Sequence, residues 1–124
     1  MEFLFDRNRR ICSRYETIGI MSKISDGEST FVGVVADISI NGLRISHIPA
    51  PFNDMVEKCY SIVNGPANDF VLALHPRWMQ ITNNGMYKMI GFKIEDPPAN
   101  WTAFVVSIKE NGEFSGFVSQ SAAA

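Results

Sequence analysis

The sequence has little of what zinc-binding, secreted or membrane-spanning proteins need. It has two cysteines, Cys12 and Cys59, and no CxxC or Cys/His spacing, so we expect reduced thiols and no metal site. No apolar run approaches the roughly 20 residues of a membrane-spanning helix. The acidic start, Met1-Glu2-Phe3-Leu4-Phe5-Asp6, is unlike a signal peptide. These absences predict a cytoplasmic protein without membrane insertion.

Residue patterns that carry catalysis are missing too. The sequence shows no Ser-His-Asp or Cys-His arrangement, no phosphate-binding glycine loop followed by lysine, and no paired carboxylates in a shared context. The two histidines, His47 and His75, are isolated in the sequence, which favours a structural role over catalysis or metal binding. We therefore expect a protein that is not an enzyme and needs no cofactor.

Positive charge is scarce overall but concentrated near the N-terminus. The net charge is −2, which disfavours a nucleic-acid-binding protein held by electrostatics alone. Four of the eleven basic residues nevertheless lie within eight positions, and all four are arginine. A guanidinium group offers planar, multi-donor recognition, so this cluster indicates a specific ligand. The four are Arg7, Arg9, Arg10 and Arg14.

What the sequence does contain is the pattern of an all-β domain. At 124 residues and 46% hydrophobic content, one core is expected. Short stretches rich in β-branched and apolar residues alternate with turn residues such as Asn83-Asn84-Gly85. This rhythm is typical of a meandering antiparallel barrel or sandwich. Strands are predicted from Tyr15 to the turn that starts at Ser25, and at 30–38, 43–48, 58–63, 70–81 and 87–95.

One helix is predicted after Asp96-Pro97-Pro98, over residues 99–109. Its apolar residues recur at i, i+3, i+4 and i+7, so one face should pack on the barrel; they are Trp101, Phe104, Val105 and Ile108. Trp101 and Trp78 both lie in periodic apolar segments, which predicts core positions for both. We divide the chain into an arginine-rich arm (1–14), a barrel with its helix (15–110) and a loose tail (111–124).

Two short motifs border the first two predicted strands. The first is Arg10-Ile11-Cys12-Ser13-Arg14, and the second is Asp37-Ile38-Ser39-Ile40-Asn41-Gly42. Their order, their separation of about twenty residues and the all-β surroundings resemble the paired RxxxR and [D/N]xSxxG signature of the PilZ family. The resemblance continues at Pro76-Arg77-Trp78 and at Gly91-Phe92-Lys93-Ile94. It implies a six-stranded antiparallel PilZ-like β-barrel with one C-terminal helix.

The resemblance also implies a ligand, the bacterial second messenger cyclic di-GMP, and a protein partner that receives the signal, for example in motility or biofilm control. Arg10 and Arg14 are the family positions for this ligand. Guanidinium groups pair with phosphate oxygens, donate to guanine O6 and N7, and stack on bases. Arg9 would add contacts if the ligand binds as a stacked dimer. We also expect the arm to become ordered on binding.

The second motif would read the guanine base. The carboxylate of Asp37 can accept hydrogen bonds from guanine N1–H and N2–H, a pairing that adenine does not offer. Ser39 would donate to the base or hold Asp37 in place. Gly42 would permit either a positive φ or a close approach of the backbone. On local pattern alone, Asn41-Gly42 predicts a hairpin turn.

Two other functions fit part of the sequence. One is a nucleotide-independent PilZ-like interaction module, which the presence of Arg10, Arg14, Asp37 and Ser39 disfavours. The other is a small barrel that binds single-stranded nucleic acid through the arginines and aromatic residues. The acidic pI of 5.6 and the shortage of basic residues on the strands disfavour this second alternative.

Overall fold

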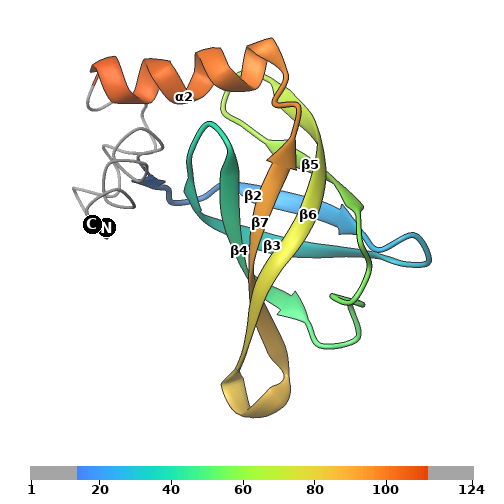
Figure 1. The fold of residues 1–124 in the computed structure, drawn as a ribbon. Coiled ribbons are helices and arrows are strands. Elements are labelled where there is room, and N and C mark those ends of the chain that lie inside the picture. Colours follow the sequence, from blue (N-terminus) through green and yellow to red (C-terminus); the bar gives the residue numbers. More distant parts are fainter. Residues whose placement is uncertain (1–13, 112–124) are drawn as a thin grey trace, which may run out of the picture.

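A computed structural model describes residues 14–111 and shows a closed antiparallel barrel with one helix (Figure 1). Around the barrel the strands follow the order β3-β2-β5-β6-β7-β4, and pairing of β3 with β4 closes the ring. The predicted six-stranded barrel is confirmed, with strand bounds close to those expected. They are β2 (Met21–Ser25), β3 (Thr30–Ile38), β4 (Gly42–Pro49), β5 (Cys59–Asn64), β6 (Asp69–Thr82) and β7 (Tyr87–Glu95).

The prediction of one strand from Tyr15 to the turn at Ser25 is wrong in one respect, because the structure has two strands there. A two-residue strand, β1 (Tyr15–Glu16), pairs with the end of β3, and β2 pairs with the start of β3. Between them Gly19 has a φ of 84°, a left-handed conformation that interrupts a strand and that glycine adopts readily. The hydroxyl of Thr17 donates to the carbonyl of Val35 at 2.9 Å. This contact keeps the chain before β2 against β3.

The barrel interior is filled by one face of each strand. Because side chains alternate along a strand, the inward positions are almost completely buried, and most of them are apolar. Ser22 and Ser61 are polar exceptions, and their hydroxyls hydrogen-bond each other. Members of this core include Ile24, Val35, Ile45, Val63, Leu72 and Ile90. Within residues 14–111, no helix has the length and apolar content needed to span a membrane.

The helix α2 (Ala99–Asn111) lies across one end of the barrel (Figure 1). Trp101, Val105 and Ile108 are buried, and Phe104 packs against the core at its edge, so the predicted apolar face is confirmed. The ring of Phe70 contacts both Phe104 and Trp101, with centroids 5.0 and 5.3 Å apart. The predicted core position of Trp101 is therefore correct.

The predicted core position of Trp78 is wrong, since its side chain is 44% exposed. The pairing of β6 with β7 shifts register between Pro76 and Trp78. Such a bulge adds a residue and reverses which face the following side chains occupy. Trp78 consequently lies on the outer surface, where β6 and β7 form a long hairpin that extends beyond the barrel (Figure 1).

The cysteine and histidine predictions have mixed outcomes. Cys59 is a free, buried thiol, and burial raises its pKa to about 12, so it remains protonated at neutral pH. Cys12 lies outside the described residues. His75 is not isolated in space, because one ring nitrogen is 2.8 Å from the carboxylate of Glu95 and the other is 2.9 Å from the carbonyl of Glu57. These contacts give His75 a structural role between two strands and a loop.

The indole N–H of Trp101 ties α2 to the barrel by donating to the buried carbonyl of Ser39 at 3.1 Å. Trp101→Phe keeps most of the ring but leaves this carbonyl without its donor. We expect a loss of about 1–3 kcal/mol in the free energy of unfolding, measured by urea denaturation.

The matched control is Trp78→Phe, which changes the exposed tryptophan and should alter the free energy of unfolding by less than about 1 kcal/mol. Equal effects of the two substitutions would contradict the assigned role of the Trp101 hydrogen bond.

Candidate functional site

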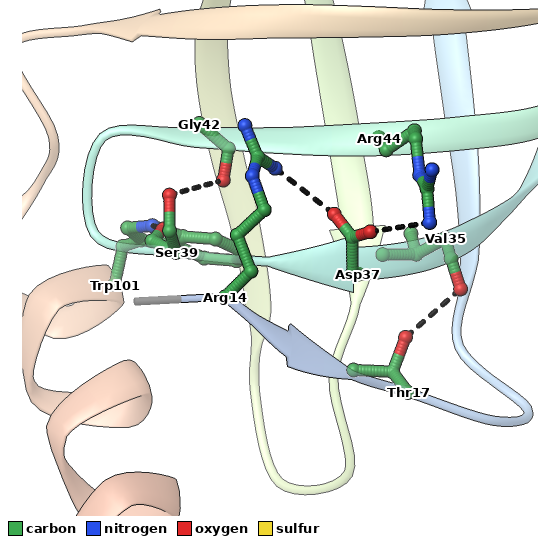
Figure 2. Close-up of polar contacts among 8 residues, drawn as sticks. All are labelled: Arg14, Thr17, Val35, Asp37, Ser39, Gly42, Arg44 and Trp101. Carbon is green, nitrogen blue, oxygen red and sulfur yellow. Dashed lines mark hydrogen bonds and ion pairs between the residues drawn. The ribbon is translucent and has the colours of Figure 1, made fainter. Parts of the chain in front are cut away.

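The carboxylate of Asp37 is the centre of the candidate site (Figure 2). Its side chain is only 7% exposed, and both of its oxygens face a guanidinium group. Arg14 donates from Nη1 to Oδ1 at 2.9 Å, and Nη2 of Arg44 lies 2.6 Å from Oδ2. A carboxylate this deeply buried requires such partners, because an uncompensated charge there is costly.

A β-bulge presents Asp37 on the outside of the barrel. The pairing of β3 with β4 shifts register between Val35 and Asp37, so Val35 opposes Ile45 while Asp37 opposes Arg44. Without the extra residue, Asp37 would share the inner face with Val35, two positions earlier. The bulge therefore allows a charged side chain to follow the apolar inward run of β3.

Ser39 shapes the turn that joins β3 to β4. Its backbone N–H donates to the carbonyl of Gly42 at 2.8 Å, and its hydroxyl donates to the same oxygen at 3.1 Å. The hydroxyl thus stabilises the turn and does not hold the side chain of Asp37. The carbonyl of Ser39 accepts the indole N–H of Trp101, so the turn is fixed from the helix side as well.

Gly42 is required by a close approach of backbones, the second of the two predicted reasons. A Cβ atom at this position would lie 2.7 Å from the carbonyl oxygen of Phe92 and 3.8 Å from Nη2 of Arg14. Asn41 and Gly42 are absent from the positive-φ residues of the described chain, so they do not form the type I′ turn that their sequence favours. Gly42 is instead the first residue of β4.

The structure brings four of the six predicted ligand residues to one end of the β3–β4 pair. Arg14 contacts Asp37, and Ser39 and Gly42 form the adjoining turn. Arg9 and Arg10 lie outside the described residues, as do Arg7 and almost all of the predicted arm and tail. The ligand roles of all six remain predictions.

Sequence reasoning missed two residues on the same outer surface: Arg44, which contacts Asp37, and Trp78, three strands away. Cross-strand pairing runs from Asp37 to Arg44, from Arg44 to Gly91 and from Gly91 to Trp78, across four neighbouring strands. A Cβ atom at Gly91 would collide with the indole of Trp78, so this ring lies directly over the glycine. Trp78 thereby presents an exposed aromatic surface next to the strand that carries Arg44.

Positive charge exceeds negative charge at this site. Arg14 and Arg44 share the carboxylate of Asp37, Lys93 is the cross-strand partner of Gly42, and Glu16 is the cross-strand partner of Asp37, so three cations face two carboxylates. The Nε–H of Arg44 is buried and has no hydrogen-bond partner within residues 14–111. The site therefore combines surplus cations, a carboxylate and an aromatic ring, a set that suits an anionic ligand carrying a base.

Comparison with known proteins depends on structure alone, since no protein-family model and no curated protein matches this sequence. The inhibitor of motility MotI/DgrA of Bacillus subtilis superposes with a TM-score of 0.58 at 13% identity, covering 83% of this chain and 52% of that one. The PlzA protein of Borreliella burgdorferi, solved in complex with c-di-GMP, gives a TM-score of 0.49 at 14% identity, covering 77% and 47%.

This chain spans about half the length of either solved chain. At 13% sequence identity, the likeness to MotI/DgrA is evidence for the fold alone. Together with the strand order found here, it shows that the chain has a PilZ-like fold.

Proposed function

We propose that this chain binds cyclic di-GMP at the Asp37 site and passes the signal to a protein partner. The single observation that carries the proposal is the contact between Arg14 and Asp37, which joins the two sequence motifs in space. The proposal takes its support from the fold as well, because a protein named as an inhibitor of motility shares it. Control of motility is therefore the process we favour.

The arginines would hold the phosphates. Arg14 is half exposed and has one terminal nitrogen committed to Asp37, while Arg44 is 37% exposed and has one terminal nitrogen at Asp37 and a buried Nε–H. A guanidinium has five N–H donors, so each side chain has terminal donors beyond its contact with Asp37, and those of the more exposed Arg14 are the better placed to meet a phosphodiester anion. Arg9 and Arg10 precede Arg14 in the chain and would contribute further donors to a ligand with two phosphates.

Asp37 would read the base, but only after an exchange of partners. Both of its oxygens already face arginines, so guanine N1–H and N2–H must replace one of these contacts. Arg14 is the more exposed of the two, and the strand that follows it has only two residues. We therefore expect Arg14 to turn from Asp37 to a phosphate while Arg44 stays in place.

Trp78 would provide the stacking surface for a guanine. Its exposed ring lies over Gly91, beside Arg44, where a flat base held by Asp37 would meet it. Stacking of a base on an aromatic side chain contributes about 1–3 kcal/mol.

The alternative is a nucleotide-independent interaction module with the same barrel. One observation favours it: the carboxylate of Asp37 is already satisfied by two arginines, so the site is complete without a nucleotide. The titrations below separate the two proposals, since only the first predicts saturable binding of cyclic di-GMP.

Arg14→Ala should weaken binding of cyclic di-GMP by about 10- to 100-fold, because a hydrogen bond to a charged group contributes about 1.5–3 kcal/mol. Isothermal titration calorimetry measures the affinity and the stoichiometry together. The control is Lys23→Ala, which removes an exposed cation from β2 on another side of the barrel and should leave the affinity unchanged. Absence of binding by the wild-type chain would favour the alternative module.

Asp37→Asn should reduce the preference for cyclic di-GMP over cyclic di-AMP, because an amide no longer offers two acceptors to guanine N1–H and N2–H. Competition binding with the two dinucleotides measures this preference for wild type and variant. A preference that is unchanged in the variant would show that Asp37 does not read the base.

The intrinsic fluorescence of Trp78 should be quenched when a guanine stacks on it. We expect saturable quenching in the wild-type chain and little in Trp78→Phe, where the buried Trp101 alone emits. Quenching that persists in Trp78→Phe would place the base elsewhere.

A further inference from the structure

A second surface, separate from the Asp37 site, is apolar and exposed. It lies on the outer side of β3, β2, β5 and β6, and we call it the four-strand face. Five large apolar side chains on it are each between 39% and 66% exposed. They are Met21, Val32, Tyr60, Ile62 and Val71.

Strand register shows that these side chains are neighbours. One row of cross-strand partners runs from Val32 through Lys23 and Ile62 to Val71. Met21 lies two residues from Lys23 on the same side of β2, in the next row along the strands. Tyr60 lies two residues from Ile62 on β5, in the next row in the other direction. The five residues therefore form one continuous patch and are not scattered singly.

The fold does not need this patch. The inward residues between these positions, such as Ile24 and Val63, fill the core, while α2 covers an end of the barrel and not its wall (Figure 1). Apolar side chains that are contiguous on the surface, unlike those scattered singly, call for an explanation, and contact with a partner is one. Because the barrel is closed, a partner cannot extend the sheet here by adding a strand, so contact must be through side chains.

Lys23 indicates the charge of the partner. It is the only charged residue in the central row, it is exposed, and no ion pair or hydrogen bond of its side chain occurs in the described part of the chain. A two-fold dimer through this face would bring Lys23 of one copy towards Lys23 of the other, which disfavours self-association. A carboxylate set among apolar side chains complements both the charge of Lys23 and the apolar residues around it.

The size of the face indicates the shape of the partner. Four strands about 4.8 Å apart span roughly 14 Å, and the rows extend about 14 Å along the strands. This footprint is too small for a standard interface of about 800 Å² per partner. It matches about ten residues of an α-helix, which are about 15 Å long and about 10 Å wide.

We propose that the four-strand face binds an amphipathic helix of a protein partner, with the apolar stripe of the helix on Ile62 and Val71 and an acidic side chain paired with Lys23. The face is separate from the nucleotide site. Met21, the member of the face nearest to Asp37 along β3, pairs with Val34, three residues before Asp37, which corresponds to about 10 Å along the strand. Of the other strands, β2 and β5 carry only the face, and β4 and β7 carry only the nucleotide site. The proposal therefore goes beyond cyclic di-GMP binding and does not depend on it.

The probe is a phage-displayed library of helical 14-residue peptides, selected on the wild-type chain without nucleotide and counter-selected on Val71→Asp. We expect enriched peptides with apolar residues at i, i+3, i+4 and i+7 and an aspartate or glutamate beside this stripe. Absence of enrichment over the counter-selection, or enriched peptides without the acidic residue, would overturn the proposal.

The best enriched peptide is then synthesised and titrated into the ¹⁵N-labelled chain. Amide shifts should change at residues 21–24, 60–63 and 71–73. Lys23→Glu should weaken binding of this peptide by at least about tenfold. The variant should instead prefer a peptide in which lysine replaces the acidic residue, and its spectrum should keep the dispersion of a folded barrel. Unchanged affinity in Lys23→Glu would reject the ion pair.

Two further results would overturn the helix proposal and assign the face to another partner. Shifts in the same residues on raising the concentration of the chain alone would assign the face to a second copy. Saturable binding of vesicles of phosphatidylglycerol through these residues, without peptide enrichment, would assign it to a lipid surface. No nucleotide is present in these experiments, so failure of cyclic di-GMP binding would leave their outcome unaffected.

Discussion

The carboxylate of Asp37, held between Arg14 and Arg44, is the interaction on which the candidate site depends. It joins three parts of the chain: the residue that precedes β1, the end of β3 and the second residue after the start of β4. Since a nearly buried carboxylate is costly without partners, an event that removes Arg14 must supply another donor. A guanine edge is such a donor, and this requirement couples the proposed ligand to the position of the N-terminal segment.

Two β-bulges determine which side chains the site contains. One separates Val35 from Asp37 and the other separates Pro76 from Trp78. In each case simple alternation would direct the later residue into the core, and the extra residue turns it outward. The barrel thus keeps an apolar interior while the same strands present a carboxylate and an indole on the surface.

The bulges also explain what sequence could and could not predict. Strand positions were predicted closely, because turn residues such as Asn83-Asn84-Gly85 separate the apolar stretches, and motif spacing correctly indicated that Arg14 and Asp37 belong together. Arg44 and Trp78 were missed because their proximity to Asp37 depends on register across four strands. Register is set by pairing between distant segments, which no local pattern contains. Gly91, which leaves room for the ring of Trp78, was the one sequence feature that could have indicated this pairing.

The position of the two proposed sites on one barrel limits how a signal can travel between them. A closed barrel with a close-packed interior responds to small forces by moving its loops and terminal segments, not by changing the shape of its wall. The turn at Ser39 is held by the indole of Trp101, and Arg14 lies on the chain that enters β1. Exchange of partners at Asp37 would therefore act on α2 and on the N-terminal segment first. The four-strand face would keep its shape in both states, so it suits a partner that stays bound while the nucleotide comes and goes.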